Sequence, residues 1–109
     1  MVIDAETLNS KLNSYVADVK KVMPIDKVYL YGSYARGTPH KWSDVDVCFF
    51  SKAFESRSSI DVVVDLMEIA WKYNPAICFE PRAFPTSELE NDNPFVKEIV
   101  RTGREIALS

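Results

Sequence analysis

Two short groups of residues in the chain have types and spacing that suit chemistry. Gly32 and Ser33 directly follow an apolar run that ends at Tyr31. Glycine lets the backbone turn sharply and lets a ligand approach closely, because it has no Cβ. The segment after this turn is predicted to begin a short helix, whose free N–H groups and positive dipole end suit a phosphate. Ser33 then either contacts that phosphate or caps the helix.

Asp44 and Asp46 form the second group, at the start of a predicted strand over residues 44–50. Residues two apart on a strand point to the same face, so both carboxylates are predicted to lie together. Neighbouring carboxylates repel each other unless a cation lies between them, and their hard oxygens suit Mg²⁺. Together, the two groups predict a phosphate-binding turn beside a metal site.

Arg36 is a cation between these two groups. It either contacts a phosphate or forms a salt bridge with a neighbouring carboxylate, and the sequence favours neither role. The segment that follows, with His40, Lys41 and Trp42, is predicted to be a surface loop by its composition. A simpler reading of the whole stretch is a strand–turn–strand unit whose aspartates are solvated at a sheet edge.

The combined pattern resembles the signature of the DNA polymerase β-like nucleotidyltransferase superfamily. Gly-Ser-Tyr-Ala-Arg-Gly-Thr at 32–38, with Ser-Asp-Val-Asp at 43–46, is similar to its smallest branch, the minimal nucleotidyltransferases. Asn-Pro-Phe-Val-Lys-Glu-Ile at 93–99, followed by Thr-Gly, resembles the C-terminus of small stand-alone members. The resemblance covers about 28–106 and implies an α/β fold, the polymerase β-like nucleotidyltransferase fold, with a small mixed β-sheet and packed helices.

Members of this superfamily usually carry a third carboxylate, commonly aspartate, on a strand after an intervening helix. Here the acidic residue at that place is a glutamate, Glu80, in the sequence Glu-Pro-Arg. It is either this third carboxylate or a strand-end charge beside Arg82. The resemblance implies these site residues: catalytic and metal-binding Asp44, Asp46 and Glu80, and nucleotide-binding Gly32, Ser33 and Arg36.

The activity that the resemblance implies is transfer of a nucleoside monophosphate, expected to be AMP from ATP, to a hydroxyl. Two Mg²⁺ ions would assist, and Glu80 would accept the proton of the attacking hydroxyl. Stand-alone minimal members are frequently antitoxins beside HEPN-domain ribonuclease toxins, so such a toxin is the expected partner. The alternatives are a catalytically silent binding module of the same fold, a small-molecule nucleotidyltransferase of the aminoglycoside type, and a metal-dependent nuclease.

Length and composition limit the class of protein. The 109 residues are expected to form one domain, 1–109. Net charge is −3 and no basic run appears, so the sequence gives no strong nucleic-acid signal. No apolar run approaches the roughly 20 residues that a membrane helix needs, and no signal peptide is evident. A cytoplasmic protein without membrane contact is therefore expected.

The first half of the chain predicts two long helices and a strand. A helix is predicted to start at the N-cap Asp4 and to stop before Pro24, and a strand follows at Lys27–Tyr31. A second long helix is predicted to start at Ser58, although its three consecutive valines favour a strand. Apolar residues at helical spacing predict its buried stripe as Ile60, Val63, Val64, Met67 and Trp71.

The next segment predicts a strand and a short helical turn. A third strand is predicted over 76–80, ended by Pro81, and Thr86 or Ser87 is predicted to cap the turn after it. The two cysteines, Cys48 and Cys78, lie in predicted apolar strands without a CxxC pair. Both are expected to be buried, reduced thiols.

The last helix is predicted from Asn93, its N-cap, with Pro94 at its first position. Gly103 is predicted to end it, before a final strand over 106–108. Its inward-facing residues are predicted to be Phe95, Val96, Ile99 and Val100.

Overall fold

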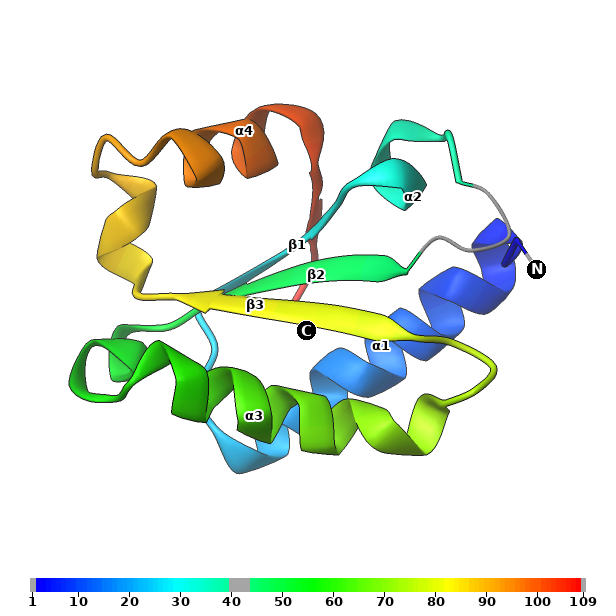
Figure 1. Ribbon diagram of the computed structural model, residues 1–109, viewed down its shortest axis with the longest axis horizontal. Coiled ribbons are helices and arrows are strands. Elements are labelled where there is room, and N and C mark those ends of the chain that lie inside the picture. The colour runs from blue at the N-terminus through cyan, green and yellow to red at the C-terminus, as the bar shows by residue number, and fades with distance from the viewer. Residues whose placement is uncertain (1, 40–43, 109) are drawn as a thin grey trace.

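A four-stranded mixed sheet runs through the middle of the protein, with helices on both faces (Figure 1). The computed structural model describes residues 2–39 and 44–108. Within these ranges the strand order is β3-β2-β1-β4; β2 is antiparallel to β1 and parallel to β3, and β4 is antiparallel to β1. The strands are β1 (Lys27–Tyr31), β2 (Val45–Phe50), β3 (Phe79–Phe84) and β4 (Arg104–Ile106).

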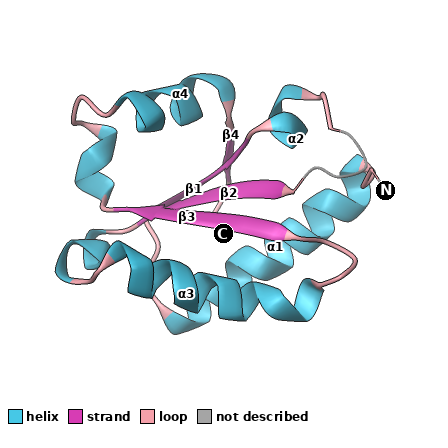
Figure 2. Cartoon of the chain, in the orientation of Figure 1, coloured by secondary structure: helices cyan, strands magenta, loops and turns pink. Residues whose placement is uncertain are grey.

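Helices cover the two faces of the sheet unequally (Figure 2). The long helices α1 and α3 pack on one face over the main core, and α4 packs on the other over a smaller apolar cluster. The short α2 follows β1 directly. The helix bounds are α1 (Ala5–Val22), α2 (Ser33–Arg36), α3 (Ser59–Ala70) and α4 (Pro94–Thr102), with 3₁₀ turns at Lys52–Ser56, Trp71–Tyr73 and Thr86–Leu89.

Tyr15 joins three elements at the centre of the main core. It is fully buried on α1, and its ring stacks on that of Phe79 in β3 at 4.5 Å between centroids. Its hydroxyl donates a hydrogen bond to the carbonyl oxygen of Leu66 in α3, at 2.7 Å. A buried hydroxyl needs such a partner, so this bond fixes α3 relative to α1 and the sheet.

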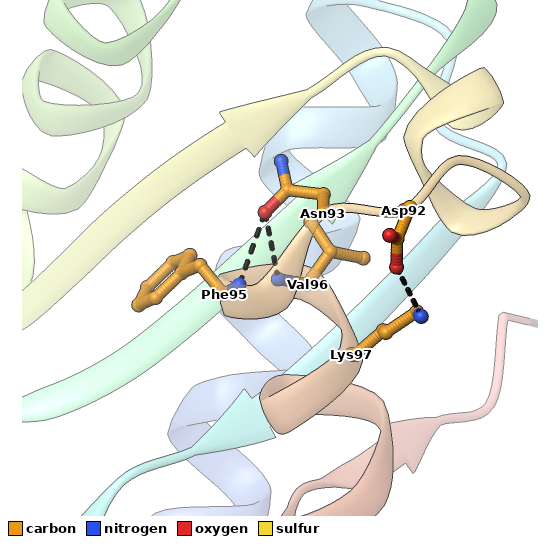
Figure 3. Close-up of polar contacts among 5 residues, drawn as sticks. All are labelled: Asp92, Asn93, Phe95, Val96 and Lys97. Atoms are coloured by element: carbon orange, nitrogen blue, oxygen red, sulfur yellow. Dashed lines mark hydrogen bonds and ion pairs between the residues drawn. The ribbon is translucent and has the colours of Figure 1, made fainter.

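Several predicted elements are confirmed. The Asp4 carboxylate caps α1 by accepting a hydrogen bond from the Thr7 N–H at 2.8 Å, and β1 has the predicted bounds. Asn93 caps α4 by accepting from the N–H groups of Phe95 and Val96 (Figure 3). Across residues 2–39 and 44–108, no helix combines the length and the apolar character that crossing a membrane requires.

The third strand differs from its prediction. It runs over Phe79–Phe84 rather than 76–80, and Pro81 lies inside it. β3 is an edge strand, where a proline need not remove a hydrogen bond of the ladder. Because the strand starts later, Cys78 precedes it and is exposed, whereas Cys48 in β2 is buried as predicted.

The predicted buried stripe of α3 is wrong. The residues of α3 that the structure buries are Val62, Leu66 and Ala70. Of the five predicted residues, Val63 is partly buried, and Ile60, Val64, Met67 and Trp71 are exposed. This helix is apolar on two sides, and the sheet contacts only one of them.

The C-terminal segment also differs in detail. On α4 the predicted Val96 and Ile99 are buried, but Phe95 and Val100 are more than two-fifths exposed. The final strand is Arg104–Ile106, earlier than predicted. The prediction that Thr86 or Ser87 caps the next turn is wrong, because the N-cap residue of that 3₁₀ turn is Pro85 and no side chain caps it. The Thr86 hydroxyl instead donates a hydrogen bond to the Asp26 carboxylate at 2.6 Å.

Candidate active site

Strand pairing sets three polar side chains in one row across the sheet. Tyr31 pairs with Asp46 between β1 and β2, and Asp46 pairs with Glu80 between β2 and β3. Residues paired across neighbouring strands lie on the same face. Asp46 and Glu80, which are far apart in the chain, are therefore immediate neighbours in the fold.

This face of the sheet is only partly covered. Further along the same strands, α4 packs on the buried Tyr29, Cys48 and Phe50. In the row that contains Asp46, Tyr31 packs against that cluster and its ring contacts the Phe95 ring of α4, whereas Asp46 is only partly buried and Glu80 is exposed. The opposite face of β2 is buried against α1 and α3. Alternation along β2 thus anchors the strand by its apolar side chains and leaves its carboxylate face accessible.

Asp44 lies just before β2 and is exposed. The N–H of the next residue, Val45, donates to the carbonyl oxygen of Cys78 at 2.9 Å, so the start of β2 is held against the segment that leads into β3. Asp44 therefore precedes the strand by one residue, and the common orientation of the Asp44 and Asp46 carboxylates stays a prediction.

The Gly32 turn packs directly against the Asp46 carboxylate. A Cβ added at Gly32 would lie 2.1 Å from Asp46 Oδ2, far inside contact distance. Gly32 also has φ +75° and ψ −155°, a region that side-chain-bearing residues hardly occupy. Both constraints require glycine, and the two groups recognised in the sequence therefore touch.

Helix α2 begins at Ser33 with Gly32 as its N-cap, so the proposed capping role of Ser33 is wrong. The helix closes through the Arg36 N–H, which donates to the Gly32 carbonyl oxygen at 3.1 Å. Tyr34 fixes the other side of the turn, because its hydroxyl accepts a hydrogen bond from the Ile3 N–H at 3.2 Å. The first N–H groups of α2 are left without intrahelical partners, as at any helix start.

Asp46 is the electrostatic centre of the site. Its pKa is raised to about 6 from an ordinary value of 3.8, first by burial and then by the negative charges of Glu80 and Asp44. The positive charges of Arg82 and Arg36 oppose this rise. Arg36 is exposed and forms no ion pair within the described residues. The only support for its predicted salt bridge is therefore its longer-range attraction to Asp46.

Arg82 is a neighbour of the site that sequence reasoning did not assign. It follows Glu80 by two residues on β3, so both point to the carboxylate face. Its guanidinium lies over the Phe95 ring, 5.3 Å from the ring centroid. Burial raises the pKa of Tyr31, and the positive charge of Arg82 partly opposes that rise. No ion pair joins Glu80 and Arg82 in the part of the chain that the structure describes, which weakens the reading of Glu80 as a strand-end charge beside Arg82.

The donor set suits a hard divalent cation. Within 2–39 and 44–108, no three acidic, thiol or imidazole side chains already converge on one ion position. Mg²⁺ does not require such a cage, because it is usually held by one or two carboxylates together with water and substrate phosphates. Asp46, with Asp44 and Glu80 beside it, offers oxygen ligands whose mutual repulsion a cation would relieve.

The loop predicted after Arg36 falls partly outside the described residues. His40, Lys41 and Trp42 of the predicted loop, and Ser43 of the second motif, lie outside the described residues. The structure does bring Gly32, Asp46 and Glu80 together, with Ser33 next to Gly32 and Asp44 just before the start of β2.

The chain and its fold are similar to known proteins. A family described as "Nucleotidyltransferase domain" matches residues 10–108. A solved structure described as "Crystal structure of putative nucleotidyltransferase" aligns with a TM-score of 0.61 at 22% identity, covering 90% of this chain and 99% of that chain. No curated protein matches the chain. At that identity the solved structure bears on the fold alone, and it confirms the predicted mixed α/β architecture.

We expect Gly32→Ala to destabilise the protein by more than Gly37→Ala, measured by urea unfolding. Both glycines have positive φ, but a Cβ at Gly37 meets nothing within 4 Å, whereas one at Gly32 strikes Asp46. The Gly37 change should cost about 1–2 kcal/mol for the left-handed backbone alone. Adding Asp46→Ala to Gly32→Ala should recover part of the loss. Equal losses at the two glycines would contradict the contact between the turn and the carboxylate.

We expect Asp46→Asn to raise stability at pH 7 to 8 in metal-free buffer, by about 1–2 kcal/mol after allowance for solvent screening. Because the pKa of Asp46 is higher in the folded protein, the folded state holds this proton more tightly. Ionised Asp46 therefore lowers the free energy of unfolding, and this decrease develops as the pH rises from 3.8 to about 6.

Thermal and urea unfolding from pH 3.5 to 8 will test this pH dependence. The gain of Asp46→Asn over the parent should shrink toward zero below about pH 4. Glu90→Gln, which removes an exposed carboxylate outside the site, is the control and should give no such pH-dependent gain. A gain that is constant across the range would rule out the raised pKa.

Proposed function

Because the chain belongs to the nucleotidyltransferase domain family, we propose that it transfers AMP from ATP to a hydroxyl acceptor. The acceptor oxygen forms a bond to the α-phosphorus, the bond from that phosphorus to the β-bridging oxygen breaks, and pyrophosphate leaves. The observation that carries this proposal is the juxtaposition of Gly32, Asp46 and Glu80 across β1, β2 and β3.

The turn at Gly32 would seat the terminal phosphates. Its backbone has no Cβ to exclude a ligand, and the first N–H groups of α2 and the Ser33 hydroxyl are donors of the kind that phosphate oxygens accept. Arg36 is exposed on the same short helix and would add positive charge beside the phosphates. The contact between Gly32 and Asp46 places this turn next to the carboxylates.

Asp44, Asp46 and Glu80 would hold two Mg²⁺ ions. When bound, such ions stabilise the charge that develops on the attacking and leaving oxygens of an in-line displacement. The residues themselves supply hard oxygen ligands at one edge of the sheet. Arg82, held over the Phe95 ring, would supply a fixed positive charge near the same oxygens.

Glu80 would accept the proton of the attacking hydroxyl. It is exposed on the carboxylate face, beside Asp46, so an acceptor can reach it from solvent. A carboxylate in this position has the chemistry of a general base. Its side chain is longer than that of the usual aspartate, which is the one feature that favours the alternative of a catalytically silent nucleotide-binding module.

We propose a partner protein as the acceptor, a HEPN-domain toxin that this chain inactivates as an antitoxin. The support is the resemblance of 32–38 and 93–99 to stand-alone minimal nucleotidyltransferases. We also propose a cytoplasmic location, which agrees with two cysteines that form no disulfide. Labelling with α-labelled ATP and Mg²⁺, in the presence of the protein encoded by the adjacent reading frame, tests the acceptor directly.

The double change Asp44→Asn with Asp46→Asn should abolish Mg²⁺-dependent ATP binding while the fold is retained. The metal-binding oxygens are lost, but the apolar face of β2 is untouched. Calorimetric titration with Mg²⁺-ATP measures the affinity, and circular dichroism checks the fold. A variant that binds Mg²⁺-ATP as tightly as the parent would disprove the metal assignment.

Glu80→Gln separates an enzyme from a binding module. The change keeps the side chain's size but removes its basic oxygen, so ATP binding should be largely unchanged. Transfer of label should fall by roughly 10²–10⁴-fold, the usual contribution of a positioned general base.

The comparison is made at matched ATP occupancy, with Glu90→Gln as the control outside the site. A binding module gives no label in the parent. If Glu80→Gln labels the acceptor as fast as the parent, Glu80 is not the base.

A further inference from the structure

One side of α3, together with the first residue of the 3₁₀ turn that follows it, exposes a continuous row of large apolar side chains. The row consists of Ile60, Val64, Met67 and Trp71, with exposed fractions of 73%, 47%, 54% and 74%. We call these four residues the α3 seam. Single exposed apolar residues are common on protein surfaces, but a contiguous row of them marks an interaction site.

The spacing of the seam is that of a helix-pairing surface. Its residues recur at intervals of four, three and four, which is the a/d pattern of helices that pack together side by side. A hollow of about 420 Å³ lies along it, lined by Val64, Met67, Glu68 and Trp71. The seam spans about 16 Å at 1.5 Å per residue, enough for three turns of a second helix.

No described element covers the seam. The opposite stripe of α3, with Val62, Leu66 and Ala70, already packs on the sheet and α1. In Figure 1, α3 lies along the outer edge of the fold below β3, on the side away from α4. Because Asp46 faces the α4 side, a molecule that docks on the seam leaves the carboxylates open.

The charges beside the seam are acidic. Asp61 and Glu68 flank it on its solvent side, and no cation pairs with either of them within the described residues. The nearby cations are already engaged: Arg57 pairs with Asp65 at 2.7 Å and Lys72 with Asp18 at 2.6 Å. The surface therefore offers an apolar row with an unneutralised negative border.

This border argues against a second copy of the chain as the occupant. In an antiparallel pair of α3 helices, the acidic flank of one copy would face the acidic flank of the other, and like charges there are repulsive. In a parallel pair, Asp61 and Glu68 would face apolar residues and gain no partner. An anionic membrane surface is disfavoured for the same reason of charge.

We infer that the α3 seam docks an amphipathic helix of a partner protein, with apolar residues facing the seam and Lys or Arg at its edges. The apolar row supplies the buried area, and Asp61 and Glu68 select the basic helix and its orientation. This inference does not rest on the proposed function, because the seam and the carboxylates lie on different faces of the sheet.

A pair of synthetic helical peptides tests the inference. Both carry leucine at heptad positions a and d; one carries lysine at e and g, the other glutamate. The lysine peptide should bind the intact protein, measured by fluorescence anisotropy, and the glutamate peptide should bind at least about tenfold more weakly. Equal binding of the two peptides, or none of the lysine peptide, would overturn the inference.

Matched variants locate the binding. Met67→Glu and Trp71→Ala should each weaken binding of the lysine peptide by about tenfold or more, the scale for a central interface side chain. Val22→Glu, which changes an equally exposed valine on α1, should leave it unchanged. Asp61→Lys with Glu68→Lys should reverse the preference between the peptides. Circular dichroism and thermal unfolding check that each variant is folded.

Sedimentation of the parent at increasing concentration tests the competing occupant. We expect the parent to form no dimer through the α3 seam at any of these concentrations. A dimer that Met67→Glu dissociates would make a second copy the occupant and would overturn it. If ATP transfer fails while the lysine peptide still binds as described, only the proposed reaction is lost.

Discussion

The position of β2 between β1 and β3 is the constraint on which the rest of this structure depends. One face of β2 is fully buried against α1 and α3, so its register is fixed by the core. A slip of one residue would turn Asp46 into the core and an apolar side chain toward solvent. The same register sets Asp46 beside Glu80 on one side, and Gly32 is packed against its carboxylate. The register of the core thus determines the geometry of the site.

The site is electrostatically unfavourable by itself. Burial and two neighbouring carboxylates raise the pKa of Asp46, so its ionised form lowers the stability of the folded protein. Buried contacts elsewhere offset this loss, among them the bond from Tyr15 to the Leu66 carbonyl, which ties α1 to α3. Perturbed carboxylates of this kind are typical of functional sites, and a bound cation would relieve the repulsion among them.

The helices cover the two faces of the sheet to different extents. On the face of α1 and α3, apolar contacts supply most of the core, and α3 keeps a second apolar row turned outward. On the other face, α4 covers only part of the strands and leaves the carboxylates accessible. The proposed reaction and the proposed helix-docking surface therefore lie on separate surfaces of one small fold, and a bound helix on α3 need not obstruct the carboxylates.

The sequence by itself determined the local features of this protein. The Gly32 turn and the caps at Asp4 and Asn93 follow from backbone preferences and short-range periodicity. These depend on neighbours in the chain, so they can be predicted without the fold. The polymerase β-like α/β fold was predictable because a local motif identified its family, not because the strand order was visible in the sequence.

Only the tertiary structure decided the rest. Asp46 and Glu80 are neighbours because β2 pairs with β3, a strand distant in the sequence. The same pairing places Arg82 on their face of the sheet. Pro81 fits inside β3 because that strand lies at the edge of the sheet. On α3, both apolar stripes have helical spacing, so periodicity could not distinguish them. The sheet and α1 buried one stripe and left the other exposed, because a helix packed on a single sheet can bury only one side.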